Sequence, residues 1–231
     1  MNRARSTARY VGSAFLISNV TFILGAVVLV EAILGAPDYL SLASANRAQI
    51  ILGVLFEWIN AIAFVGIAVL MFPILRRRFE SLALAYVGFR IVEFVTQILA
   101  DVGALSLLLL SEEFVKAGSP ASSAFLTVGA TLLDVRFWSF QMLYLIFSLS
   151  GLLFYYMLYR TDLIPRFVSI WGLAGAALVL FQTLVDMFGL TLDPSISVIT
   201  GLPMLLNELF LGIWLIAKGF NPSAAILEAA Q

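Results

Sequence analysis

The sequence predicts an all-α fold, an integral membrane bundle of six transmembrane helices that forms one domain over residues 1–231. The first observation is composition: 62% of the residues are hydrophobic and 12% are charged, against about 45–50% and about 25% in soluble domains. The second is a mean hydropathy of +1.04, which excludes a soluble fold because such a fold needs polar residues to cover its core. The third is the length of the apolar stretches, which matches the roughly 20 residues that a helix needs to cross the hydrocarbon core.

Six stretches of the chain have this length and lack the strict alternation of a β-strand. Backbone inside a bilayer must satisfy its own hydrogen bonds, so each stretch is predicted as a helix. They cover residues 10–34, 50–74, 82–110, 136–159, 166–189 and 195–218. The first follows basic residues, as a signal peptide does, but it exceeds the usual apolar length of about 7–15 residues, and we expect it to be retained. No polar linker is long enough to separate two domains.

Several residues agree with these boundaries. Pro165 stands at the start of the fifth span, where its missing N–H costs nothing. Gly219 follows the last span at a position that favours a helix C-cap. Gly172 and Gly175 in the fifth span predict close helix packing. Residues 122–133 either form a short helix on the outer surface or extend the fourth span outward.

Basic residues are distributed unevenly among the connections, and cytoplasmic loops carry the excess of Lys and Arg. The first, third and fifth connections hold Arg47 and Lys116. Nine basic residues lie before the first span, in the second and fourth connections and at the end of the last span: Arg3, Arg5, Arg9, Arg76, Arg77, Arg78, Arg160, Arg166 and Lys218. Both termini are therefore predicted to be cytoplasmic.

Several function classes are excluded by residues that the chain lacks. The net charge is −1, so no basic excess meets phosphate and no nucleic acid is expected as a partner. There are no cysteines and no histidines, which removes thiol catalysis, the commonest general base and the favoured zinc ligand. No phosphate loop or nucleotide fingerprint occurs, and neither a cofactor nor a metal is predicted. The expected partner is the lipid bilayer, and the sequence leaves the oligomeric state open.

The third span carries a polar stripe. Arg90, Glu93, Gln97 and Asp101 are spaced 3, 4 and 4 residues apart, which places them on one helix face. A charged side chain at mid-bilayer costs about 2.5–3.5 kcal/mol on insertion scales. We therefore expect this face to point into the bundle, with Arg90 as the internal counter-ion of Glu93.

Other spans supply matching groups. Glu57 and Asn60 share one face of the second span, and Asn207 and Glu208 lie near the centre of the sixth. Further interior polar residues are Asn19, Gln141, Gln182 and Asp186. Arg90 is then the one deep cation for four carboxylates, so at least two of these carboxylates would hold a proton or a bound cation.

Pro203 lies inside the sixth span and removes one helical hydrogen bond. We expect a helix kink one turn from Asn207 and Glu208, because interrupted helices lie beside the binding sites of many transporters.

Three segments, residues 83–93, 156–172 and 202–220, together resemble the uncharacterised bacterial membrane family DUF4386. The resemblance extends over nearly the whole chain and implies a multi-pass protein of the bacterial cytoplasmic membrane. It implies no activity. It suggests that Arg90, Glu93, Pro203 and Glu208 belong to a shared pattern.

The leading hypothesis is binding or passage of a small cation, a proton or a cationic solute through an outward-facing acidic cavity. Its predicted lining is Glu57, Asn60, Glu93, Gln97, Asp101, Asn207 and Glu208. An intramembrane enzyme that uses carboxylates, with or without a divalent metal, is a second hypothesis, which the absence of histidine disfavours. A structural or regulatory membrane subunit without a site is the third.

Overall fold

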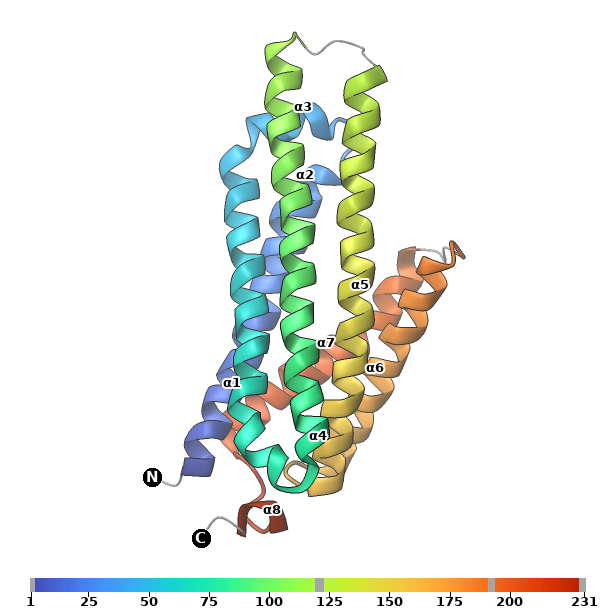
Figure 1. Cartoon of the computed structure of the whole chain (residues 1–231). Helices are drawn as coiled ribbons and strands as arrows, with labels where there is room; N and C mark the ends of the chain where they lie inside the picture. The colour runs from blue at the N-terminus through green and yellow to red at the C-terminus, as the bar shows by residue number, and fades with distance from the viewer. Residues whose placement is uncertain (1–2, 119–122, 191–193, 229–231) are drawn as a thin grey trace.

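The computed structural model describes residues 3–118, 123–190 and 194–228 (Figure 1). Within these ranges all regular structure is helical, and the elements are α1 (Arg3–Phe22), the π-helix η1 (Ile23–Glu31), α2 (Ala32–Leu34), α3 (Tyr39–Ala45), α4 (Arg47–Lys116), α5 (Ser123–Thr161), α6 (Arg166–Met187), α7 (Pro194–Ala217) and α8 (Ala225–Glu228).

Five helical segments of the described chain are long and apolar enough to cross a membrane: Ala4–Leu34, Arg47–Lys116, Ser123–Thr161, Arg166–Met187 and Ile199–Ala217. The fold is therefore a helical bundle of the membrane type. The second and third predicted spans, residues 50–74 and 82–110, both fall within α4.

Helix α4 consists of two antiparallel arms. Phe79 has non-helical dihedral angles, φ −136° and ψ 59°, and the chain reverses direction at the lower end of the bundle (Figure 1). We refer to residues 47–78 as the first arm and residues 80–116 as the second arm. Pro73 lies inside the first arm without ending it.

Helix α5 begins at Ser123, so residues 123–133 extend the fourth span and do not form a separate surface helix. The helix that contains the fourth predicted span therefore begins 13 residues before residue 136, as the second of the two alternatives expected. The second arm of α4 and α5 rise side by side beyond α6 and α7 (Figure 1). Arg136, which the sequence places at the start of the span, consequently lies well inside a helix.

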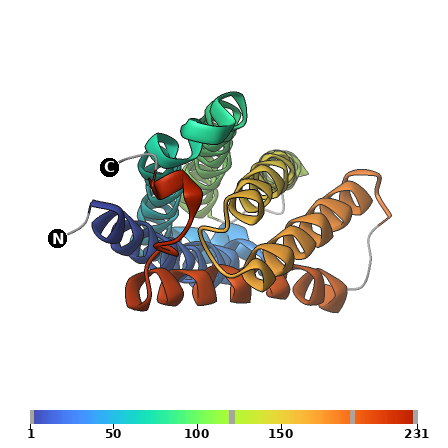
Figure 2. The same cartoon turned by 90° about the horizontal axis from the view of Figure 1, so that it is seen from below.

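The long helices form a ring. Helix α4 packs against α1 and α5, α5 packs against α6, α6 against α7, and α7 against α1, an arrangement visible along the bundle axis (Figure 2). Glycines permit close contacts in this ring, as predicted for Gly172 and Gly175. A Cβ on Gly172 would overlap the Tyr155 ring, and one on Gly175 would lie 3.0 Å from Cα of Met204.

The π-helix η1 lies against the first arm of α4. A Cβ on Gly25 would lie 2.7 Å from the Gly53 carbonyl oxygen, and a Cβ on Gly53 would lie 2.5 Å from the Val30 side chain. Two glycines therefore let the two backbones approach closely.

Helix α1 begins at the same end of the bundle as the turn at Phe79, the connection from α5 to α6, and α8 (Figure 1). The basic residues around these elements, including Arg76, Arg77 and Arg78, thus gather at one end.

Candidate functional site

Arg90 and the seven polar residues predicted to line the cavity are all buried. None of Glu57, Asn60, Arg90, Glu93, Gln97, Asp101, Asn207 and Glu208 is more than 6% exposed. They do not converge in one acidic pocket, however. The structure divides them between a cluster around Arg136, an ion pair at Arg90 and a cavity beside Glu208.

The Arg136 cluster joins η1, both arms of α4, and α5. The Arg136 guanidinium donates to Glu57 at 2.9 Å and to Glu31 at 2.8 Å, and it lies 3.7 Å from Asp101. Its third hydrogen bond is donated to the Ala100 carbonyl oxygen at 3.2 Å. The arginine is 3% exposed, so these contacts satisfy a cation that is removed from water.

Gln97 completes the cluster from the second arm. Its Nε2 atom donates to Glu57 at 2.6 Å and to Asp101 at 3.1 Å. Gln97 therefore bridges the two carboxylates with an uncharged amide group, while Arg136 supplies the positive charge.

This cluster corrects the expectation that Arg90 is the one deep cation. The predicted fourth span begins at residue 136, which would put Arg136 at the membrane boundary, and Glu31 is not among the predicted site residues. The sequence feature that could have indicated this position is the apolar run before Arg136. This run extends the helix beyond the arginine, so that Arg136 lies inside the bundle instead of at the helix end. The partners of Arg136 depend on tertiary packing and could not be read from spacing.

Arg90 forms the predicted pair with Glu93. Its Nη1 atom lies 3.0 Å and 2.8 Å from the two carboxylate oxygens. Aromatic rings surround the guanidinium, which lies 4.3 Å from the centroid of the Phe64 ring and 5.3 Å from that of Phe147. Such contacts stabilise a desolvated cation by about 2 kcal/mol.

Glu208 has no salt-bridge partner within the described chain. Its Oε2 atom accepts one hydrogen bond from Asn19 at 3.3 Å, and its Oε1 atom has no hydrogen-bond partner among the described residues. Arg90 acts on Glu208 electrostatically but is bonded to Glu93. Glu208 is thus a buried carboxylate, 3% exposed, with unused hydrogen-bonding capacity.

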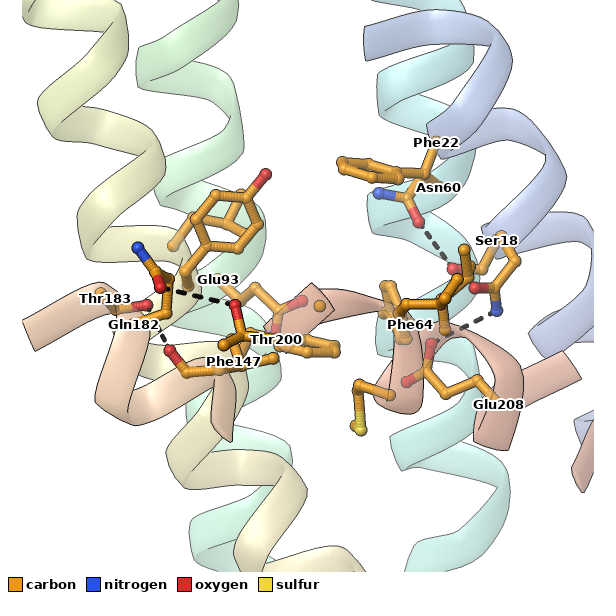
Figure 3. A pocket seen from close by; sticks show the side chains of 18 of the residues that line it. Ser18, Phe22, Asn60, Phe64, Glu93, Phe147, Gln182, Thr183, Thr200 and Glu208 are labelled. Atoms are coloured by element: carbon orange, nitrogen blue, oxygen red, sulfur yellow. Dashed lines mark hydrogen bonds between the residues drawn. The ribbon is translucent and has the colours of Figure 1, made fainter. Parts of the chain in front are cut away.

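A cavity of about 380 Å³ lies between α1, α4, α5, α6 and α7. In Figure 3, Ser18, Asn60 and Glu208 lie on one side of it and Gln182 and Thr200 on the other. Its polar lining is Ser18, Asn19, Asn60, Glu93, Gln141, Tyr144, Gln182, Thr183, Asp186, Thr200 and Glu208. The remaining wall is apolar and includes three phenylalanines, Phe22, Phe64 and Phe147.

The structure places only some of the residues of the predicted lining around this cavity. Asn60, Glu93 and Glu208 line this cavity, whereas Glu57, Gln97, Asp101 and Asn207 are not among its lining residues. The first three of these belong to the Arg136 cluster. Asn207 instead donates to the Val168 carbonyl oxygen at 2.9 Å and joins α7 to α6.

Further lining residues come from helices with isolated polar positions. Gln141, Gln182 and Asp186 were expected in the interior, and Gln182 donates to Asp186 at 2.9 Å. Ser18 and Thr183 were missed because hydroxyl groups are common in membrane helices, where they bond to their own backbone or to a neighbouring helix. Ser18 bonds to the amide oxygen of Asn60 at 2.6 Å.

Pro203 lies between two cavity-lining residues, Leu202 and Met204. Helix α7 nevertheless continues through it from Pro194 to Ala217. Pro203 therefore removes a backbone hydrogen bond without ending the helix, and the kink expected there stays a prediction.

The cavity combines carboxylates with apolar and aromatic walls. Asp186 and Glu208 contribute carboxylates that have no salt-bridge partner in the described chain, whereas Glu93 is paired with Arg90. Such a surface attracts positive charge, and its walls match an apolar molecular body. The described chain contains no group of three or more potential metal-ligating side chains.

Ring architecture, buried ion pairs and an internal cavity define a polytopic helical protein of the membrane type. The chain belongs to the DUF4386 family, described as a domain of unknown function, which matches residues 10–219. The family resemblance expected from the three sequence segments is thereby confirmed. No curated protein and no solved structure matches the chain.

Proposed function

We propose that this protein spans the cytoplasmic membrane six times, with both termini in the cytoplasm, and that it binds a small organic cation in the cavity for passage across the bilayer. The observation that carries the proposal is Glu208. This carboxylate faces an apolar cavity, lacks a salt-bridge partner in the described chain and leaves Oε1 without a hydrogen bond.

The two arms of α4 support six spans. Each arm exceeds the roughly 20 residues needed to cross the hydrocarbon core, and the non-helical Phe79 separates them. The basic residues near this turn lie at the same end as the start of α1 and α8 (Figure 1). Under the positive-inside rule this end faces the cytoplasm.

The lining favours an organic cation over a bare metal ion. The cavity of about 380 Å³ falls within the size range of small-molecule sites. Calcium and magnesium ions need about six or more oxygen ligands around one point. The polar side chains of this lining lie on opposite sides of the cavity (Figure 3), and the described residues include no group of three or more acidic side chains that could hold a metal ion. The rings of Phe64 and Phe147 already contact Arg90. A substituted ammonium group can instead contact the ring of Phe22, which also lines the cavity, while Glu208 supplies the negative charge.

Binding of two radiolabelled probes, tetraethylammonium and tetraphenylphosphonium, to the purified protein in lipid nanodiscs tests the proposal. We expect saturable binding of at least one probe and a loss of affinity of tenfold or more in Glu208→Gln, which keeps the shape and removes the charge. Glu113→Gln is the matched control, because Glu113 is exposed on α4 (65% of its side chain) and should bind like the wild type.

Uptake of the bound probe into liposomes tests passage separately. A wild-type protein that binds neither probe, or a Glu208→Gln variant that binds as tightly as the wild type, would refute the assignment of the cavity. Probe binding without uptake would restrict the function to binding.

A structural role is the second candidate, and the Arg90 and Arg136 clusters favour it. Each cluster joins side chains that are buried and bonded to one another, as expected of groups that fix helix register. If neither probe binds and both Arg90 and Arg136 are needed for folding, the hypothesis of a structural or regulatory subunit replaces that of cation transport. The carboxylate-based enzyme gains no support, because Glu57 and Asp101 lie against Arg136 and Glu93 pairs with Arg90 instead of converging on one open site.

A further inference from the structure

The Arg136 cluster contains an oxygen atom that the rest of the cluster does not satisfy. Asp101 is 1% exposed, and its Oδ2 atom has no hydrogen-bond partner in the described part of the chain. Its other oxygen, Oδ1, accepts from Gln97 at 3.1 Å and lies 3.7 Å from Arg136. A buried carboxylate oxygen without a partner is costly, unless it carries a proton or binds a ligand.

Asp101 also lies against a second carboxyl group. The Asp101 and Glu57 carboxyl groups lie close together, because both accept from the same nitrogen atom, Nε2 of Gln97, at 3.1 Å and 2.6 Å. Two carboxylates that share one site repel each other when both are ionised. One proton between them converts this repulsion into an O–H···O hydrogen bond.

The charges around this pair leave room for one proton. The groups that face it are Glu31 on η1 together with Arg136 and Tyr144 on α5. Glu31 lies outside the buried part of the cluster, since 48% of its side chain is exposed. With Asp101 and Glu57 both ionised, the buried part of the cluster carries two negative charges against the single charge of Arg136. One added proton makes it neutral.

We propose that Asp101 and Glu57 form a proton-binding site, in which the proton resides on Oδ2 of Asp101 and is shared with the carboxylate of Glu57. The proton comes from water, forms one O–H bond and returns to water on release, so no other bond changes. The site is distinct from the solute cavity, because neither carboxylate lines the cavity, and it does not rest on the proposed cation function.

A proton fits this position better than a metal cation. Arg136 already occupies one side of both carboxylates and repels a second full charge. Gln97 presents its amide nitrogen to the pair, which donates to oxygen and cannot ligate a cation. The unsatisfied capacity is a single oxygen atom, which corresponds to one hydrogen.

Infrared difference spectroscopy of the full chain in liposomes tests the site through the C=O stretching band of a protonated carboxyl group. We expect this band at neutral pH in the wild type and a shift of it when the aspartates carry ¹³C in their side-chain carboxyl groups. Asp101→Asn should abolish the labelled band, while Asp134→Asn, which removes an exposed aspartate on α5, should retain it. The isotope shift needs no substitution, so it remains decisive if Asp101→Asn fails to fold.

Glu57→Gln provides the second variant. It should shift the frequency of the labelled band, because the acceptor of the shared proton loses its charge. The proposal is overturned if the wild type shows no protonated aspartate band at neutral pH or if Asp101→Asn retains that band. A band that disappears on addition of sodium chloride at constant pH would also overturn it and assign the site to sodium.

Discussion

Replacement of Arg136 by methionine is expected to be among the most destabilising single changes in the bundle. Arg136 is 3% exposed, and it contacts Glu57 at 2.9 Å and Glu31 at 2.8 Å. Methionine keeps an apolar stem of similar length but leaves Glu57, 1% exposed, without a cation. Breaking a buried pair by removing one partner costs about 3–5 kcal/mol, and we expect Arg136→Met to lose this amount.

The free energy of unfolding can be measured by titration with sodium dodecyl sulfate, followed by far-ultraviolet circular dichroism. The control is Arg47→Met, because Arg47 pairs with Glu112 at an exposed position, with 54% of the arginine side chain accessible. Exposed pairs contribute about 0–1 kcal/mol, so the control should unfold close to the wild type.

The double variant Arg136→Met/Glu57→Gln separates charge from packing. Removing the stranded charge should recover at least about 1 kcal/mol relative to Arg136→Met, within the range of coupling between residues in contact. Equal stability of Arg136→Met and Arg47→Met would refute the reasoning, as would a double variant that is no more stable than the single one.

Two further predictions concern packing and pH. Gly172→Ala should destabilise the protein by about 1–3 kcal/mol, because the added Cβ would overlap the ring of Tyr155. Gly88→Ala should be neutral or stabilising by up to about 1 kcal/mol, since its Cβ would meet no described atom within 4 Å. The same unfolding titration compares the two variants, and equal losses of stability would contradict the packing at Gly172. Hydrogen bonding to Arg166 lowers the pKa of Asp162 from its usual 3.8, so wild type should exceed Asp162→Asn in stability at neutral pH, and this difference should vanish as the pH falls through the lowered pKa. Thermal unfolding of both proteins between neutral and strongly acidic pH measures it, and a difference that persists in acid would contradict the ion pair.

Hydropathy alone predicted where the chain forms long apolar helices, because each must be apolar over the thickness of a bilayer. The ends were less predictable. Residues 123–133 are apolar enough for either a surface helix or an extended span, and packing of α5 against the second arm of α4 decided between them.

Spacing predicted the Arg90–Glu93 pair because both residues lie on one helix, one turn apart. The partners of Glu57 and Glu208 come from other helices, and their identity depends on how far each helix is shifted along its neighbour. That shift placed Arg136 beside Glu57 and Asn19 beside Glu208. Residue type and depth therefore indicated which side chains are interior, while their division into a charged cluster and a cavity required the tertiary structure.

The π-helical geometry of η1 makes the length of the first span a determinant of pairing. A π turn holds more residues than an α turn, because its hydrogen bonds run to the fifth residue and not to the fourth. Deleting one residue between Gly25 and Glu31 would favour ordinary α-helix and rotate Glu31 relative to Asn19, so that one of them would leave its partner. Members of the family are accordingly expected to differ in the residue types of this segment more often than in its length.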